Sequence, residues 1–261
     1  MVCQRLKNKE RKSAGPRERA VILEVVIFIQ QARAEPAVPR PESSGIMNPV
    51  LKVEPGDRTP HLPSSSLILA SASPARALML KRAGIRCETE AARIDEEEYR
   101  NAMRAAGAPA SAVVEKLAEL KARRVARHHP EAIVIGADQI LDCEGVWFDK
   151  PPDLDRARAD LVALRGRTHE LLSCACVVQD DRRLWHHIDR AKLTMRTFTD
   201  EFLDAYLTTA GDDALTSVGA YQIEGPGAQL FSKIEGDYFT ILGLPLLPLL
   251  AYLRDLGQVK P

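Results

Sequence analysis

The sequence lacks the spacings that common metal and nucleotide motifs require. Its five cysteines form no CxxC pair and no Cys/His ligand set, and His128-His129 and His186-His187 have no partner at zinc-ligand spacing. It contains neither a GxxxxGK[ST] loop nor a REx2EExG helix. These absences exclude a zinc finger, a P-loop nucleotidase and a Nudix-type hydrolase.

The sequence also lacks an excess of charge and is poor in aromatic residues. Lys+Arg and Asp+Glu are both 36, so the formal net charge is zero, and aromatic residues make up 5% of the chain. Binding of nucleic acid or of an anionic membrane favours a basic surface, and single-stranded nucleic acid also needs aromatic platforms. We therefore expect neither partner, and any anion site must come from local placement of a few cations.

Long apolar runs are missing as well. Residues 20–29 are apolar apart from Glu24, and ten residues are too few to span a bilayer. The basic region before this run and Ala32-Arg33-Ala34 after it imitate an export signal. Proline-rich sequence then continues to about residue 63. We expect residues 1–63 to be a disordered extension, an interpretation that also allows Met47 to be the authentic start; a true export signal is the alternative.

The cysteines that remain fit the interior of a reduced protein. Cys174 and Cys176 alternate along an apolar stretch, which places both on one face of a strand as small hydrophobic residues. Unpaired thiols of this kind are typical of a reducing compartment. The expected location is cytoplasmic.

Residues 64–261 read as one α/β domain. An apolar strand at 67–70 is followed by Ser73 as N-cap, Pro74 at the first helical position and Gly84 at the C-terminal end. Further helices are expected at 112–127, 154–165, 200–207 and 244–256. Strands are expected at 132–136, 146–148, 170–178 and 184–198, the last two forming a ribbon about Gln179-Asp180-Asp181. The class is α/β with a mixed sheet.

The turn at 71–76 is a candidate anion site. Free amides at a helix N-terminus and the helix dipole favour an anion, and the hydroxyls of Ser71 and Ser73 and the cation of Arg76 are close by. Arg76 in the first helical turn opposes the dipole, so its position calls for a reason. An ordinary capped helix with a surface arginine is the alternative.

Several charged residues elsewhere have a functional and a plain interpretation. Asp138 directly follows the expected strand at 132–136, at the carboxyl end where α/β sheets bind ligands, or it caps a turn. The acidic run at 95–98, which includes Glu96, holds a metal or is solvated surface. Lys121 lies near the buried stripe of a helix and Lys150 precedes Pro151-Pro152 in a loop; on these features alone each fits a plain surface lysine.

Taken together, these features resemble the Maf family of nucleotide pyrophosphatases. The resemblance is carried, in this order, by LILASASPAR, the ID-E at Ile94–Glu96, KLAELKARRV, GADQ, Lys150-Pro151, GRTHE, SVGAYQIEGPGAQLF, IEGDY and GLPL, and it covers about 67–256. It implies a two-lobed α/β fold with a central cleft, related to inosine-triphosphate pyrophosphatase, and conversion of a nucleoside triphosphate to monophosphate and pyrophosphate with Mg²⁺ or Mn²⁺. It also implies a homodimer.

The resemblance implies a role for each matching residue. Ser71, Ser73 and Arg76 would hold the phosphate tail, and Lys121 and Lys150 would neutralise phosphate. Glu96 and Asp138 would form the acidic pair that holds the metal, with Asp138 as the catalytic carboxylate that accepts a proton from water. A regulator of cell division and septum formation that binds nucleotide with little turnover is the competing function.

Three positions depart from the commonest Maf pattern. Ala75 replaces an arginine, Gln139 a threonine and Glu224 a glutamine, at positions tied to base selection in the branch that hydrolyses dTTP and UTP. Gln139 and Glu224 look like the branch acting on 7-methyl-GTP, which has a bulky aromatic where Ala75 sits. Glu224 can accept two N–H groups of a guanine edge; a metal ligand or a loop-stabilising acid is its alternative. We expect a modified purine nucleotide over dTTP or UTP.

Overall fold

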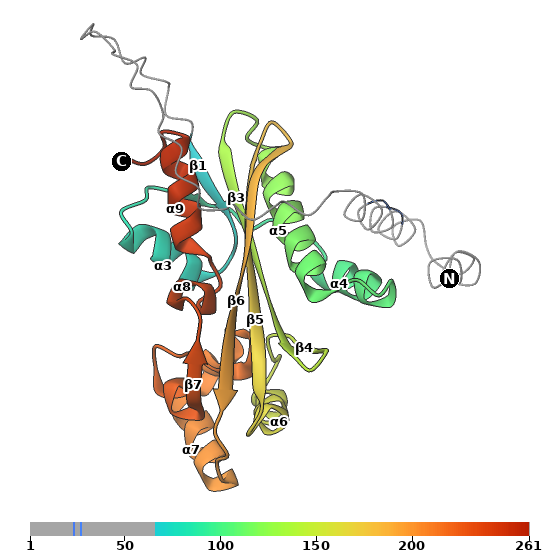
Figure 1. Ribbon diagram of the computed structural model, residues 1–261, viewed down its shortest axis with the longest axis vertical. Helices are drawn as coiled ribbons and strands as arrows, with labels where there is room; N and C mark the ends of the chain where they lie inside the picture. The colour runs from blue at the N-terminus through green and yellow to red at the C-terminus, as the bar shows by residue number, and fades with distance from the viewer. Residues whose placement is uncertain (1–22, 24–26, 28–65, 261) are drawn as a thin grey trace, which may run out of the picture.

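The computed structural model describes residues 23, 27 and 66–260, and the chain folds there into an elongated α/β molecule (Figure 1). A long sheet runs through its whole length. Helices α3 and α9 lie on one side of its upper part in this view and α4 and α5 on the other, while α6 and α7 lie beside its lower part. The expected extension at 1–63 lies outside the described residues, apart from Leu23 and Ile27.

The sheet is mixed, as predicted. Its order is β2-β1-β3-β5-β6-β7, and β4 pairs with β3. Strand β1 is parallel to β2 and β3, and the other pairs are antiparallel. The strands are β1 (Leu67–Ala70), β2 (Glu88–Thr89), β3 (Ile133–Cys143), β4 (Val146–Phe148), β5 (Thr168–Gln179), β6 (Arg182–Met195) and β7 (Phe231–Glu235).

The α-helices of the described part include five that the sequence predicts. These are α3 (Pro74–Arg82), α5 (Ala110–Ala126), α6 (Leu154–Leu164), α7 (Asp200–Ala210) and α9 (Leu246–Asp255). Two were not expected, α4 (Glu96–Ala105) and α8 (Tyr238–Ile241), nor were the 3-10 turns η1 (Gly211–Leu215), η2 (Val218–Ala220) and η3 (Pro226–Leu230). Within these residues no helix combines the length and apolarity that crossing a membrane requires.

Three apolar cores hold the two halves of the molecule. One lies between the sheet and α5, with Leu117 and Val125, and a second lies on the opposite face under α3 and α9, with Leu80 and Leu249. The third fills the other half beneath α6 and α7. Two cores at one end and one at the other give the two-lobed shape that the resemblance implies.

Strand β3 does not end where the apolar run ends, which corrects the prediction for Asp138. The strand continues to Cys143 because β5 pairs with it from Val134 to Asp142. On the other edge, β1 pairs only as far as Gly136 and β4 only from Leu141. Asp138 therefore lies inside a strand, at a stretch of its edge that neither β1 nor β4 covers.

Gly136 lets helix α5 lie unusually close to β3. A Cβ added at this glycine would come within 2.0 Å of the Ala118 carbonyl oxygen and 2.9 Å of the Ala122 nitrogen. Those atoms belong to the helix backbone and cannot rotate away. The missing side chain thus sets the distance between the helix and the strand.

We predict that Gly136→Ala lowers the free energy of unfolding by about 2 kcal/mol or more, since overpacking against backbone forces the two elements apart. Gly84→Ala is the matched control, because its added Cβ meets nothing within 4 Å. Its positive φ of 76° leaves only a strain of about 1 kcal/mol. Urea unfolding of both variants measures the difference; equal losses would contradict the close-packing argument.

Candidate active site

Five charged side chains from five segments share one site, where the uncovered edge of β3 faces α5. Lys121 projects from α5, and its Nζ lies 2.7 Å from Asp138 Oδ1 and 2.7 Å from Glu96 Oε2. Asp138 lies on β3, and Glu96 is the first residue of α4. One ammonium therefore joins the two predicted metal-binding carboxylates.

The Lys121–Asp138 pair is buried. The two residues are 7% and 3% exposed, and a charge at such depth is tolerated only when it is paired. Only one carboxylate oxygen of Asp138 is hydrogen-bonded, however: its Oδ2 has no hydrogen-bond partner among the described residues. A buried carboxylate oxygen left open in this way is a binding position for an ion or a proton donor.

Arg76 is not a surface arginine. Its Nε donates to the Gly243 carbonyl at 2.8 Å, and its Nη1 donates to the Ala137 carbonyl at 3.0 Å and to Ser71 Oγ at 3.3 Å. Burial lowers the pKa of the guanidinium, while the charges of Asp138 and Glu96 act in the opposite direction. These bonds at the open edge of β3 explain a cation in the first turn of α3.

The two serines order the turn in front of α3. Ser73 is the N-cap, and its hydroxyl oxygen accepts from the Arg76 backbone N–H at 3.5 Å. Ser71 Oγ accepts from the Ser73 backbone N–H at 3.2 Å as well as from the Arg76 guanidinium. The predicted cap is confirmed, and the hydroxyl of Ser71 lies beside the Arg76 guanidinium.

Lys150 belongs to the same electrostatic cluster. It is an exposed residue in the loop after β4. Desolvation by nearby protein atoms lowers the pKa of its ammonium, and the positive charges of Arg76 and Lys121 lower it further, while Glu96 and Asp138 oppose the shift. The structure thus brings together the three predicted cations and both acids.

Gln139 lies on the opposite face of β3 from Asp138, as the alternation of strand side chains requires. Its amide group donates to Ser173 Oγ at 3.0 Å and to the carbonyls of Thr240 and Ile241 at 3.1 and 3.0 Å. These contacts attach α8 to the sheet, and Gly243, which accepts from Arg76, follows α8 directly. The described contacts of Gln139 are all with protein groups.

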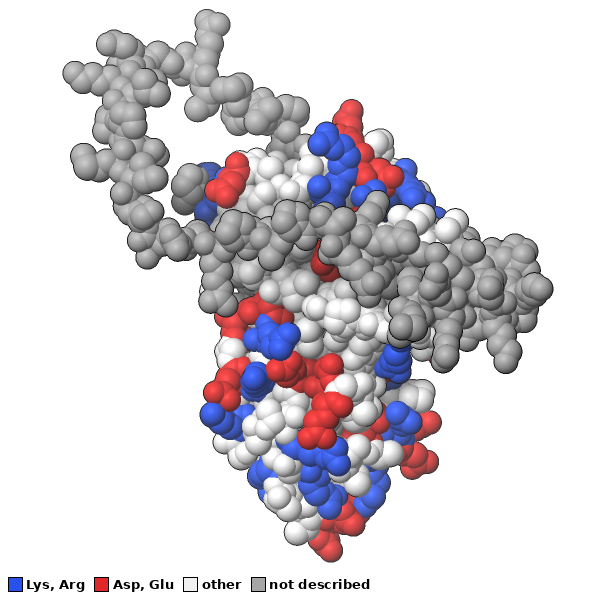
Figure 2. Space-filling view, turned by 45° about the vertical axis from the view of Figure 1, so that its right-hand side comes forward, with Lys and Arg blue, Asp and Glu red and all other residues white. Residues whose placement is uncertain are grey.

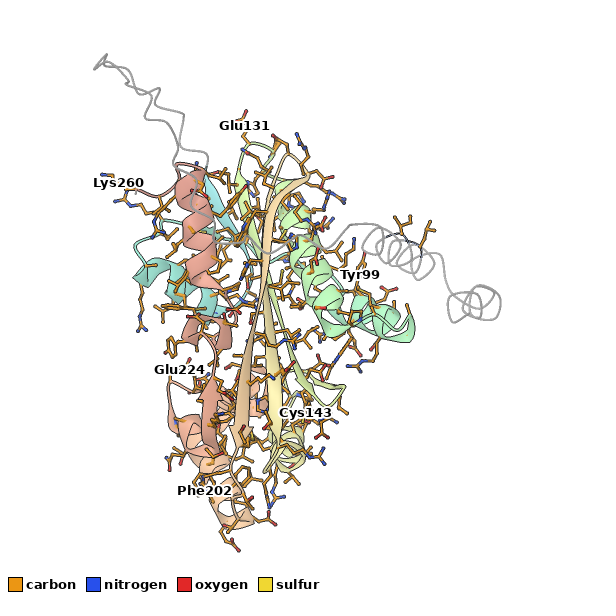
Figure 3. All side chains as sticks on the ribbon, in the orientation of Figure 1. Tyr99, Glu131, Cys143, Phe202, Glu224 and Lys260 are labelled. Atoms are coloured by element: carbon orange, nitrogen blue, oxygen red, sulfur yellow. The ribbon has the colours of Figure 1, made fainter. Side chains whose placement is uncertain are left out.

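Glu224 lies apart from the charged cluster. It is exposed, in the loop between η2 and η3, and among the described residues no hydrogen bond links it to the five charged groups. Figure 3 shows it on the flank of the molecule below α8. Its assignment to base selection stays a prediction.

Some groups of the site leave little signal in a sequence. The carbonyls of Ala137 and Gly243 hold Arg76 through backbone atoms, which every residue type carries. The hydroxyl of Ser173 donates to the Thr240 carbonyl at 2.7 Å in the interior. The blocks GADQ and GLPL mark two of these segments, but only the fold brings them together.

Comparison with known proteins places the chain in a family. A family model described as Maf-like protein matches residues 66–256. The chain belongs to the Maf family. It is 56% identical over 194 residues to a protein of Paramagnetospirillum magneticum named nucleoside triphosphate pyrophosphatase, which covers 74% of this chain and 100% of that protein. It is 49% identical over 193 residues to a Rhizobium meliloti protein named 7-methyl-GTP pyrophosphatase, which covers 74% and 97% of the two chains.

A solved structure gives a more distant likeness. The crystal structure of a nucleoside-triphosphatase / dITP/XTP pyrophosphatase from Mycobacterium abscessus matches with a TM-score of 0.38 and 14% identity, over 75% of this chain and 98% of that one.

In Figure 2, acidic and basic side chains are interspersed over the visible described surface. That mixed surface agrees with the zero net charge and shows no large basic area on this face.

The lowered pKa of Lys150 predicts how polyphosphate binding depends on pH. A bound polyanion favours the ammonium form, so affinity falls as the pH rises through that lowered pKa. Arginine keeps its charge over this range, so Lys150→Arg should lose less affinity for tripolyphosphate between about pH 8 and about pH 10. Calorimetric titration at several pH values measures the profile. Lys81→Arg on α3 is the control, and identical profiles for all three proteins would contradict the prediction.

Proposed function

We propose that this protein hydrolyses a nucleoside triphosphate between its α- and β-phosphates, giving the monophosphate and pyrophosphate. Its membership of the Maf family and its relatives named nucleoside triphosphate pyrophosphatase make it a hydrolase of this class. The observation that supports the assignment of the site is the convergence of Arg76, Lys121 and Lys150 on the Glu96–Asp138 pair.

The cations suit the first requirement of the reaction, which is cancellation of phosphate charge. Attack by water on phosphorus is opposed by the negative charge of the phosphate tail, and charge builds further on the leaving pyrophosphate. Arg76 is bound mainly by neutral carbonyls, so its positive charge stays available to a phosphate. Lys150 is exposed and can reach an incoming tail, and the hydroxyl of Ser71 contacts the Arg76 guanidinium.

Asp138 suits the second requirement, which is activation of water. Its open Oδ2 can accept a hydrogen bond from a water molecule and then the proton, and in the free protein Oδ1 is held by Lys121. The water oxygen bonds to the α-phosphorus as the bond to the pyrophosphate oxygen breaks. Positioned general bases contribute about 10²–10⁴-fold to such reactions.

The two carboxylates also fit a divalent cation. Mg²⁺ and Mn²⁺ prefer oxygen ligands, and Mg²⁺ is commonly held by one or two carboxylates together with substrate phosphates. Glu96 and Asp138 supply the carboxylates, and the unpartnered Asp138 Oδ2 supplies an open ligand atom. The described residues contain no cluster of three or more acidic, His or Cys side chains for a metal, so phosphate oxygens would complete the shell. A bound cation would supply further charge neutralisation at the phosphates.

Asp138→Asn tests the catalytic assignment. The variant keeps the shape of the side chain but cannot take a proton, so pyrophosphate release should fall about 10²-fold or more, while circular dichroism shows a folded protein. Asp142→Asn, further along β3, is the control and should keep its activity. Near-wild-type turnover of Asp138→Asn would refute the role of Asp138. A wild-type protein that binds nucleotides without releasing pyrophosphate would instead favour the competing function, a nucleotide-binding regulator of cell division.

For the base, we propose a modified purine nucleotide similar to 7-methyl-GTP. Several relatives that this chain matches over 97% of their length carry that name, and Gln139 and Glu224 resemble that branch of the family. The carboxylate of Glu224 can accept from the ring N–H and the amino group of guanine together, and it favours a cationic methylated base. Exposure of Glu224 leaves its carboxylate free to meet a base.

A nucleotide panel tests this preference. Pyrophosphate release should be faster with 7-methyl-GTP than with UTP or dTTP, and Glu224→Gln should reduce the preference about tenfold by removing a charged acceptor. Glu131→Gln, at the far end of the molecule in Figure 3, is the control for loss of an exposed glutamate. A preference for UTP or dTTP of tenfold or more would overturn the proposal.

Two further expectations follow the family and stay proposals. Four cysteines of the described part are free thiols, three of them buried, which supports a reducing compartment such as the cytoplasm. A homodimer is expected from the resemblance alone.

A further inference from the structure

In the free protein, Lys121 occupies the space between the two carboxylates that would hold a metal. Its Nζ lies 2.7 Å from an oxygen of each. An ammonium at that distance from Asp138 and Glu96 uses the same negative charge that attracts a divalent cation. The burial of Lys121 and Asp138 makes this competition strong, because water screens it little.

The contacts of the neighbouring cations differ from those of Lys121. Arg76 is tied to the carbonyls of Ala137 and Gly243, so its guanidinium stays in place whatever binds to the carboxylates. Both polar contacts of the Lys121 ammonium described here are with carboxylates, and its four-carbon stem can rotate without any backbone change. Lys150 and Lys121 also repel each other. Lys121 is therefore the cation that can move.

We propose that Lys121 is a placeholder that couples metal binding to polyphosphate binding. In the free protein its ammonium neutralises Glu96 and Asp138 and keeps their affinity for a divalent cation low. A polyphosphate offers Lys121 another set of anionic oxygens, so Lys121 leaves the carboxylates and opens them. Cation and polyphosphate then bind with positive coupling, which is reciprocal by thermodynamic necessity. This inference rests on the proposed metal site and goes beyond the proposed reaction.

The coupling has a consequence for selectivity. With Lys121 in place, abundant free cations do not fill the site, and the carboxylates become available only when a polyanion is present. Asp138 is also kept from being an uncompensated buried charge between catalytic cycles, a state that costs several kcal/mol in proteins. One side chain thus serves both the resting and the loaded protein.

Binding of Mn²⁺ alone to the full chain, without nucleotide, tests the inference by isothermal titration calorimetry. Lys121→Met keeps the length of the stem and removes the charge, so its Mn²⁺ affinity should rise about tenfold or more over wild type. Lys81→Met removes the charge of an exposed lysine on α3, outside the charged cluster, and should change the affinity far less. Adding Glu96→Gln to Lys121→Met should abolish the gain.

The inference is overturned if Lys121→Met binds Mn²⁺ no tighter than wild type, or if the double variant keeps the gain. Lys121→Gln provides a second neutral side chain should Lys121→Met fail to fold. Failure of the proposed function is a separate result, because it shows as absent pyrophosphate release by the wild type. Tight Mn²⁺ binding by Lys121→Met with an inactive wild type would sustain the placeholder role and reject the reaction.

Discussion

The close contact between the backbones of α5 and β3 is the constraint on which the rest of the site depends. Only a residue without a side chain fits at Gly136, where a Cβ would lie 2.0 Å from the Ala118 carbonyl oxygen. Lys121 is three residues further along α5 and Asp138 two residues further along β3, on the facing sides of the two elements. The packing distance between two buried elements thus becomes the 2.7 Å distance between two charges.

The charges of the site are held in two different ways. Arg76 is bound by neutral oxygen atoms, which fix its position without pairing its charge directly with a carboxylate. Lys121 is bound by carboxylates, which compensate its charge and leave it free to exchange partners. A polyanion therefore meets one fixed positive charge and one that can be recruited. Preorganised charge of the first kind stabilises a transition state without reorganisation at the moment of reaction.

The sequence predicts local features of this fold well because their causes are local. Ser73 and Pro74 begin α3 as their cap and first-turn preferences indicate, and an apolar run marks β1. The long β3 and the helix α4 were missed because their causes lie elsewhere in the chain. Pairing with β5 extends β3 beyond its apolar residues, and the acidic run at 95–98 begins a helix capped by Asp95. Resemblance to a family identified the charged residues. That backbone carbonyls hold Arg76 is visible only in the folded structure.

The placement of Asp138 and Gln139 on opposite faces of β3 divides two tasks between neighbours in the chain. Asp138 contacts Lys121 in the charged cluster, and Gln139 supports the segment that holds Arg76. A deletion or insertion of a single residue before them would exchange the faces, putting an amide among the charges and a carboxylate against backbone carbonyls. A change of length at this point in β3 is therefore expected to disrupt the charged cluster even when every residue type is kept.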